Sequence, residues 1–465
     1  MNILKLFDRS LLFLILVFVC VTVRADSLDD KIKEIMAERH IPGAAVAVVQ
    51  NGHVVRMKGY GLASLEFDAP VTTETVFEIG SVSKQMTAAG IMLLVQDGKV
   101  SLDAKIANYL PNTPDAWRDV TVRHLLTHTS GIKSYSSLEG FGLSERMTMA
   151  DFIKKLSPHA LEFTPGERNI YSNSGFNLLA YIIEMQSGKK YMDFMRERIF
   201  TPLGMTKTGD RDPRFVIRMR ANGYEWRENR YSGRDGNLTD LMGAGSIVST
   251  INDMTKWEAA LRGDKLLNAQ SKKEIWTQYT FNNGKQSPYG LGWRISDVRG
   301  NKLIGHTGQT AGFGAAIFRY VDSEVTVIAL TNLGELGMGS LIATAAAKHY
   351  VPTLSLKAVK TGIPDDPSVF GSVEKALRAR YGGSFETSLF STTGAQLMSS
   401  PRSKNLDGRL RNYAPVSRVR FVKSESVDDR HSITVIVETP KRNFLWRVVV
   451  NEIGKIDEMS LEEEE

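Results

Sequence analysis

Two blocks of β-prone sequence that lie far apart in the chain constrain its fold most. The first block consists of residues 44–50 and 54–59, separated by Asn51-Gly52, a dipeptide that favours a tight hairpin turn. The second consists of residues 315–320 and 325–331, which follow Gly-rich turns and are typical of consecutive antiparallel strands. We expect both blocks to meet in one antiparallel sheet that helices cover, which is an α+β fold.

The sequence between the two blocks has a different texture. From residue 102 to residue 261, short helical patterns alternate with Pro- and Gly-containing loops, which indicates a mainly helical insertion. A helix is also predicted over residues 82–96, where apolar side chains recur at helical spacing and Asp97-Gly98 ends the pattern. No internal repeat is visible, which argues against solenoid and propeller folds.

A second, smaller domain is expected after a main domain that spans residues 26–355. Residues 356–368 contain prolines with neighbouring Asp residues and are interpreted as a linker. Residues 369–465 are interpreted as a small β-rich domain. Its strand-like runs are residues 417–421, 433–438 and 445–450. The closing run of glutamates, residues 462–465, is interpreted as a solvated tail.

Residues 1–25 have the pattern of a secretory signal peptide. Lys5 and Arg9 precede an apolar run over residues 11–23, and Ala25 ends a small-residue cleavage site. The run is shorter than the roughly 20 residues that a membrane-spanning helix needs, so an uncleaved anchor is the weaker alternative. We therefore expect an exported protein, periplasmic or secreted, without a stable membrane span after cleavage.

The cysteine count and the charge argue against several classes of function. The single cysteine, Cys20, lies in the signal segment, so the mature chain is expected to have no disulfide and no cysteine nucleophile. A lipid-modified Cys20 is an alternative, although Phe18-Val19 before it lack the small residues that such processing uses. The net charge is +6 at pH 7, but the basic residues are scattered, which argues against nucleic-acid binding.

Motifs for metals and phosphates are weak in this sequence. His124 and His128 have the i, i+4 spacing that can clasp a metal, but no H-E-x-x-H motif occurs, and Leu125-Leu126 between them suggests a packed helix. No glycine lies in a G-x-x-x-x-G-K-[ST] frame. We expect neither a metal nor a cofactor.

The motif with the most direct chemistry is Ser81-Val82-Ser83-Lys84, an S-x-x-K at the start of the predicted helix. Residues at i and i+3 share a helix face, so Ser81 and Lys84 are expected to touch. A serine hydroxyl becomes a strong nucleophile when a nearby base removes its proton, and a lysine kept neutral by burial or by adjacent positive charge is such a base. The helix N-terminus also offers backbone N–H groups to a developing oxyanion. Alone, however, an S-x-x-K is usually an N-cap beside a solvated lysine.

Three motifs in order resemble the serine β-lactamase-related superfamily, which contains class C β-lactamases, penicillin-binding proteins, esterases and D-aminopeptidases. The first is the segment 77–88 around Ser81. The second comprises residues 121–131 followed by Tyr171-Ser172-Asn173, which is similar to the family's Tyr-x-Asn element. The third is His306-Thr307-Gly308, which stands where the family has Lys-Thr-Gly. The resemblance covers roughly residues 30–345 and implies an antiparallel sheet flanked by helices.

The resemblance implies a role for each matching residue. Ser81 would be the nucleophile and Lys84 the group that activates it. Tyr171 would be a proton shuttle, which near neutral pH needs a cation such as Lys84 to favour its phenolate. Asn173 would bind substrate amide groups and orient Lys84.

The third motif implies the substrate-binding strand. Thr307 and Gly308 would line the substrate, Gly308 would allow close approach of the backbone, and the N–H of Gln309 would be the second oxyanion donor. His306 is the main departure from the family pattern. Histidine is mostly neutral at pH 7, whereas the family's lysine would grip a carboxylate. We therefore expect weaker use of β-lactams and of free C-terminal carboxylates.

The leading hypothesis is an exported serine hydrolase that cleaves esters, D-amino-acid peptides or peptidoglycan-like peptides through an acyl-enzyme on Ser81. One alternative is a β-lactamase or a D-alanyl-D-alanine carboxypeptidase-type penicillin-binding protein. An alternative of another class is a non-catalytic cell-envelope binding protein. Some members of the family append a lipocalin-like β-barrel, and the resemblance suggests this form for the carboxyl-terminal domain. The sequence does not determine the oligomeric state.

Overall fold

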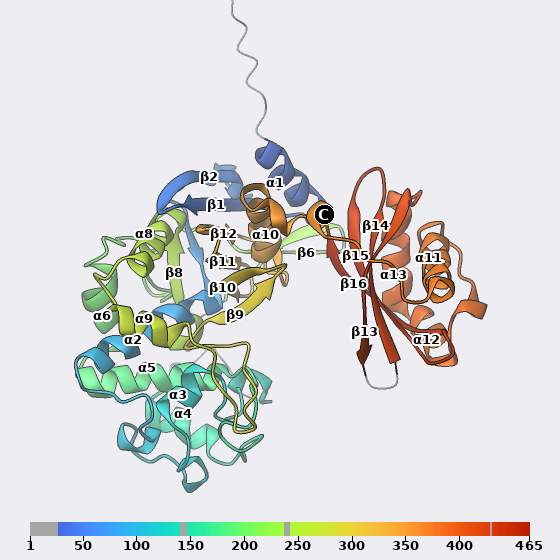
Figure 1. The fold of residues 1–465 in the computed structure, drawn as a ribbon. Helices are drawn as coiled ribbons and strands as arrows, with labels where there is room; N and C mark the ends of the chain where they lie inside the picture. Colours follow the sequence, from blue (N-terminus) through green and yellow to red (C-terminus); the bar gives the residue numbers. More distant parts are fainter. Residues whose placement is uncertain (1–26, 140–146, 237–241, 428–429) are drawn as a thin grey trace, which may run out of the picture.

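The computed structural model describes residues 27–139, 147–236, 242–427 and 430–465 (Figure 1). The predicted signal segment, with Cys20, lies outside these residues. Within the described ranges, no helix combines the length and the apolar character needed to cross a membrane.

A seven-stranded antiparallel sheet joins the two β-prone blocks, as the sequence predicts. Its strand order is β3-β2-β1-β12-β11-β10-β9. Strand β1 of the first block pairs with β12 of the second, from Ala44 opposite Thr331 to Gln50 opposite Val325. The strands are β1 (Gly43–Gln50), β2 (His53–Ser64), β3 (Ala69–Pro70), β9 (Arg294–Val298), β10 (Asn301–Gln309), β11 (Gly314–Tyr320) and β12 (Val325–Thr331).

Different helices cover the two faces of this sheet. On one face, Val46 and Val48 of β1 share a core with α1 (Ser27–Glu38) and α10 (Met338–Tyr350). On the other face, Ala45 and Ala47 share a core with the helices of the insertion. Successive residues of a strand point to opposite faces, so a strand covered on both faces is apolar throughout. This explains why residues 44–49 show no polar alternation.

The predicted helix begins with a short 3-10 turn, η1 (Gly80–Val82), and continues as α2 (Ser83–Gln96). Helix α2 is buried along nearly its whole length and contacts α5 (Asn173–Ser187). The rest of the insertion is mainly helical, as expected. It contains η2 (Ile106–Asn108), η3 (Asp115–Trp117), α3 (Val122–Leu126), η4 (Tyr135–Ser137), α4 (Met149–Leu156), α6 (Tyr191–Met195), η5 (Arg196–Phe200), α7 (Met242–Gly245), α8 (Ile251–Arg262) and the following α9 (Ala269–Ile275). Its short strands are β4 (Val76–Glu78), β5 (Gly209–Asp210), β6 (Tyr224–Arg227), β7 (Arg230–Gly233) and β8 (Ile247–Thr250).

The carboxyl-terminal part forms a separate small β domain, to the right in Figure 1. Short turns η7 (Pro352–Leu354) and η8 (Leu356–Ala358) lead into it. Its strands are β13 (Arg418–Val427), β14 (Arg430–Glu438), β15 (Asn443–Val450) and β16 (Ile456–Glu464). Its helices are α11 (Pro367–Tyr381), η9 (Thr387–Leu389), α12 (Thr392–Met398), α13 (Pro401–Leu410) and η10 (Arg411–Tyr413).

The form of this domain differs from the suggested lipocalin-like barrel. The four strands lie in one open sheet in the order β13-β14-β15-β16, and in the described residues no pairing joins β13 to β16. The helices share a core with that sheet through Val373, Leu377 and Tyr381 of α11. Four strands are too few to close a barrel around a core, so the helices bury the face that further strands would cover.

The acidic run at 462–465 is not the solvated tail that the sequence suggested. Most of it belongs to β16, whose end lies at the seam between the two domains. Glu463 pairs with Arg299 and, at 2.6 Å, with Lys348. Glu464 pairs with Arg409 and lies 3.6 Å from Arg442. The charged run is ordered because basic groups of both domains face it.

Candidate active site

The structure brings Ser81 and Lys84 together at the start of α2. Ser81 lies in the η1 turn and is partly exposed, whereas Lys84 is fully buried. The Lys84 Nζ lies 3.1 Å from the Ser81 Oγ. The helical i, i+3 relation predicted from the sequence produces this contact.

Two further acceptors surround the Lys84 amine. Its Nζ lies 2.8 Å from the Asn173 Oδ1 and 2.7 Å from the carbonyl oxygen of Ala244. Burial holds the pKa of Lys84 well below its usual value, so the amine is neutral over a wider pH range. A neutral amine has two N–H donors and one lone pair. The two acceptors occupy both donors, and the lone pair is left for the Ser81 hydroxyl.

Tyr171 lies just before α5 and faces the same amine. The Lys84 Nζ lies 4.8 Å from the centre of its ring. Burial raises the pKa of the Tyr171 phenol above its usual value, and the neighbouring Ser81 hydroxyl offsets this only in part. The phenolate that the sequence reasoning required is therefore not favoured, because burial disfavours its negative charge. Tyr171 is a protonated phenol in this site.

His128 supports Tyr171 from behind, which the sequence reasoning missed. The centres of the two rings lie 4.2 Å apart. The Nδ1 of His128 accepts a hydrogen bond from the backbone N–H of Ser172 at 3.1 Å. His128 is buried, has a φ of 58°, and its Nε2 has no hydrogen-bond partner in the described residues. Burial keeps the pKa of this imidazole well below its usual value, so the ring is neutral.

His124 and His128, whose i, i+4 spacing could bind a metal, have separate partners in the structure. His124 caps its own helix through Thr121 and lies 3.1 Å from the hydroxyl of Tyr279. His128 faces Tyr171 instead. Across the ranges that the structure describes, no group of three His, Cys, Asp or Glu side chains is arranged to hold a metal ion.

His306 is buried in β10 rather than exposed to a substrate. Its Nε2 lies 2.6 Å from the hydroxyl of Tyr289, and its Nδ1 lies 2.6 Å from the carbonyl oxygen of Thr307. The carbonyl can only accept, so the proton resides on Nδ1 and the Tyr289 hydroxyl donates to Nε2. Burial, with a contribution from Lys84, lowers the pKa of His306 to about 3. The ring centre lies 6.2 Å from that of Tyr171, so His306 forms part of the wall behind this phenol.

Two glycines let the strand β10 approach the start of α2. A Cβ on Gly80, whose φ is 49°, would lie 2.8 Å from the backbone nitrogen of Gln309. A Cβ on Gly308 would lie 3.1 Å from the backbone nitrogen of Ser81. Only glycine fits these positions without displacement of the backbone. The approach brings the backbone nitrogens of Ser81 and Gln309 close to the same two glycines.

The end of β10 also presents a free edge. Its partner β9 pairs with it only as far as Gly305, which lies opposite Arg294. Beyond that point, no strand of the described structure pairs with the outer edge of residues 306–309. An unpaired strand edge can hydrogen-bond to an extended peptide.

Arg294 is a cation at this site that the sequence reasoning missed. It is the exposed first residue of β9. Because side chains opposite each other share a face, and alternate residues do too, Arg294 and Thr307 lie on the same face of the sheet. In the described residues no carboxylate forms an ion pair with the Arg294 guanidinium, whose charge acts on both Tyr171 and His306. No motif marks such an arginine, since its place depends on the strand register.

Comparisons with known proteins were made on the whole chain. The family model described as Beta-lactamase matches residues 28–350. Penicillin-binding protein 4* of Bacillus subtilis (strain 168) is 29% identical over 414 residues, which cover 83% of this chain and 89% of that protein. A D-aminopeptidase of Brucella anthropi is 31% identical over 299 residues, which cover 63% of this chain and 56% of that protein.

Solved structures share the fold. The octameric penicillin-binding protein homologue from Pyrococcus abyssi superposes with a TM-score of 0.63 at 23% identity, over 94% of this chain and 98% of that one. At that identity the likeness concerns the fold alone. The D-amino acid amidase from Ochrobactrum anthropi SV3, in complex with L-phenylalanine, gives a TM-score of 0.59 at 27% identity, over 71% of this chain and 98% of that one.

Proposed function

The chain belongs to the beta-lactamase family, and on this basis we propose that it is a serine hydrolase that cleaves ester or amide bonds through an acyl-enzyme on Ser81. The observation that carries the proposal is the contact of a buried Lys84 amine with the hydroxyl of a partly exposed Ser81, at 3.1 Å. The amine has both its N–H groups engaged, so its lone pair can take the Ser81 proton.

In the first step, the Ser81 Oγ attacks the substrate carbonyl carbon while its proton passes to the Lys84 Nζ. The carbonyl oxygen becomes an oxyanion, which the backbone N–H groups of Ser81 and Gln309 stabilise. As the bond to the leaving group breaks, the protonated Tyr171 donates its proton to the leaving oxygen or nitrogen and recovers one from Lys84. Water then attacks the acyl-enzyme, with the neutral Lys84 as base, and Ser81 is restored.

The substrate class that we propose is an ester or an amide of a D-configured residue, including peptides of the peptidoglycan type. The free edge of residues 306–309 supports a peptide-like substrate, because it offers backbone hydrogen bonds along an extended chain. The names of the relatives, D-aminopeptidase and D-amino acid amidase, agree with amide cleavage.

A carboxypeptidase-type activity is the second candidate, and Arg294 favours it. A neutral, buried His306 does not replace the lysine that would bind a substrate carboxylate. Arg294, on the same face of the sheet as Thr307, supplies a guanidinium instead. Guanidinium groups bind carboxylates through two parallel hydrogen bonds. Arg294 could therefore bind a free C-terminal carboxylate of the substrate, which a neutral His306 could not do.

Active-site labelling tests the proposal. The purified protein is incubated with a fluorophosphonate probe and, separately, with fluorescent penicillin, and the labelled peptide is identified by mass spectrometry. We expect an adduct on Ser81 that is absent from Ser81→Ala and present in the control Ser83→Ala. Turnover is then compared for p-nitrophenyl esters, D-amino acid amides and nitrocefin. No adduct and no turnover in the folded wild type would favour the non-catalytic envelope-binding alternative.

We also propose that the protein is exported. The cationic start, the apolar run and the small residues around Ala25 support this. N-terminal sequencing of the protein expressed in a bacterial host tests it. A mature chain that begins at Asp26 in the periplasmic or secreted fraction is expected, and an uncleaved chain in the cytosol would contradict export.

A further inference from the structure

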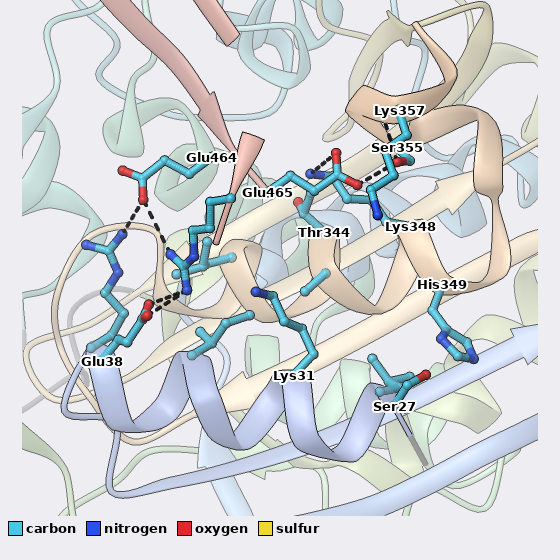
Figure 2. Close-up of a pocket in the computed structure, with 16 residues that line it drawn as sticks. Ser27, Lys31, Glu38, Thr344, Lys348, His349, Ser355, Lys357, Glu464 and Glu465 are labelled. Carbon is cyan, nitrogen blue, oxygen red and sulfur yellow. Dashed lines mark hydrogen bonds and ion pairs between the residues drawn. The ribbon is translucent and has the colours of Figure 1, made fainter. Parts of the chain in front are cut away.

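A cavity of about 450 Å³ lies at the seam between the two domains, away from the active site (Figure 2). It opens between α1, α10 and the end of β16, and none of the active-site residues lines it. Its volume is within the range of small-molecule sites, roughly 300–1,000 Å³.

Aliphatic side chains from two helices form one side of this cavity. Leu28 and Ile35 come from α1, and Leu341 and Ala345 come from α10. Leu28 and Ile35 are seven residues apart, and Leu341 and Ala345 four apart, so each pair lies on one face of its helix. Leu341 and Ala345 are partly exposed and offer an apolar surface to whatever fills the cavity, while Leu28 and Ile35 are buried beside it.

Charged side chains form the other side, and the acidic ones are already paired. Glu38 lies 2.6 Å from Arg442, which is only 8% exposed. Glu464 pairs with Arg442 and, at 3.5 Å, with Arg39. Glu465 accepts a hydrogen bond from the Ser355 hydroxyl at 2.6 Å. Each side-chain carboxylate of the lining therefore has an ion pair or a hydrogen bond.

Two cations of the lining, Lys31 and Lys357, form no ion pair in the described structure with a carboxylate of the lining. Lys357 forms no ion pair with any carboxylate in the part of the chain that the structure describes. Lys31 pairs only with Glu34, a neighbour on the same helix that does not line the cavity. In Figure 2, the side chain of Lys31 extends from α1 toward the space between the helix and the acidic strand end. The uncompensated charge of the cavity is therefore positive.

We infer that this cavity is a binding site for a small amphiphile with an alkyl body and a carboxylate head. The alkyl body would cover Leu341 and Ala345 beside the buried Leu28 and Ile35, and the head would pair with one of the two cations, Lys31 or Lys357. A fully polar anion would leave the apolar side in contact with water. A neutral alkyl compound would leave Lys357 without an ion pair and Lys31 with Glu34 alone. The walls of the cavity come from both domains. A bound ligand would therefore stabilise the contact between the two domains and raise the free energy of unfolding.

Isothermal titration calorimetry and thermal melting of the full chain test the inference, with decanoate below its critical micelle concentration as the probe. We expect saturable binding and a rise in the melting temperature. Binding of decanol, of decyltrimethylammonium and of inorganic phosphate is expected to be at least tenfold weaker. Equal binding of decanol or of phosphate would overturn the assignment of an anionic amphiphile, and so would the absence of decanoate binding at millimolar concentration.

Two sets of variants locate the site. The double variant Lys31→Ala/Lys357→Ala is expected to bind decanoate at least tenfold more weakly, while Lys33→Ala/Lys360→Ala, which removes two exposed lysines outside the cavity, binds as the wild type does. Ala345→Phe fills the apolar side and is expected to abolish binding with both cations intact. A cooperative melt of each ligand-free variant confirms its fold. Unchanged affinity in the first double variant and in Ala345→Phe would place decanoate elsewhere and contradict the inference.

Discussion

The hydroxyl of Tyr289 lies 2.6 Å from the Nε2 of His306, in the buried wall behind Tyr171. The Nδ1 of His306 donates to the Thr307 carbonyl. Both ring nitrogens are therefore hydrogen-bonded while the imidazole is neutral. Where the family resemblance leads one to expect a lysine, this site therefore contains a neutral pair of side chains. Arg294 instead supplies a positive charge on the face of the sheet that includes Thr307.

The neutral state of His306 makes stability depend on pH. Its pKa is about 3 in the folded protein and near 6.5 when exposed, so between these values the unfolded chain binds more protons and the free energy of unfolding falls as the pH falls. Between these pKa values, His306 lowers the free energy of unfolding by about 1.4 kcal/mol for each pH unit of acidification. In His306→Gln, we expect a flatter decline between pH 6 and pH 4 by urea unfolding. The exposed His349→Gln is the control and is expected to keep the wild-type slope.

Lys84 makes the free energy of unfolding depend on pH in the alkaline range. Its pKa is held well below the usual value by burial, so between the lowered pKa and about 10 the unfolded chain binds the extra proton and stability rises with pH. Lys84→Met is expected to flatten this rise and to lower kcat by about 10²–10⁴ through loss of the base. Urea unfolding at several pH values and ester turnover measure the two effects. An unchanged slope would show that Lys84 is protonated in the fold, and the exposed Lys99→Met is the matched control.

His128 is expected to act as a positioning residue for Tyr171. His128→Ala removes the ring that packs against Tyr171 and the acceptor for the Ser172 N–H. We expect kcat to fall by about tenfold to hundredfold with a smaller change in KM, because small displacements of a catalytic group have effects of this order. His128→Asn keeps an acceptor and tolerates positive φ, so it should recover part of the loss. Equal losses in kcat for both variants, or a change in KM alone, would argue against this role.

Gly308 is expected to be intolerant of any side chain. In Gly308→Ala the new Cβ meets the backbone of the Ile79–Ser81 turn, so the oxyanion donors move apart. Loss of one such donor costs about 10²–10³ in kcat. Gly209→Ala is the control, because a Cβ there has open space around it. Wild-type turnover by Gly308→Ala would contradict the proposed oxyanion site.

Arg294 separates the two candidate activities. If its guanidinium binds a substrate carboxylate, Arg294→Ala lowers kcat/KM for a peptide that ends in D-Ala-D-Ala by tenfold or more. The same peptide with a C-terminal amide is expected to be cleaved at the wild-type rate. Lys302→Ala, an exposed cation on the neighbouring strand, is the control. Equal losses for the acid and the amide would assign Arg294 to the fold rather than to carboxylate recognition.

Much of the main domain follows from local sequence. The hairpin at Asn51-Gly52, the helix that begins after Ser81 and the strands at 315–320 and 325–331 are all present. In each, the signal is a periodic pattern or a turn dipeptide that acts over a few residues. The sequence predicted that the two β-prone blocks meet in one sheet, and the structure shows that β1 pairs with β12 there.

Other features depended on contacts that no local pattern reveals. The run 462–465 looks solvated in isolation, but it ends a strand because Arg299, Lys348 and Arg442 face it from elsewhere in the chain. The helices of the carboxyl-terminal domain cover one face of a four-stranded sheet that is too small to close into a barrel. The order of the acidic run and the packing of these helices both depend on surfaces that distant parts of the chain present.

The sequence by itself determined the chemical groups of the site and one of its distances, since the i, i+3 spacing of Ser81 and Lys84 is a property of any helix. Only the tertiary structure decided their protonation. Burial lowers the pKa of Lys84 and of His306 and raises that of Tyr171, and burial depends on how α2, α5 and β10 pack together. It also decided which cation shares a face of the sheet with Thr307, because the register between β9 and β10 places Arg294 opposite Gly305.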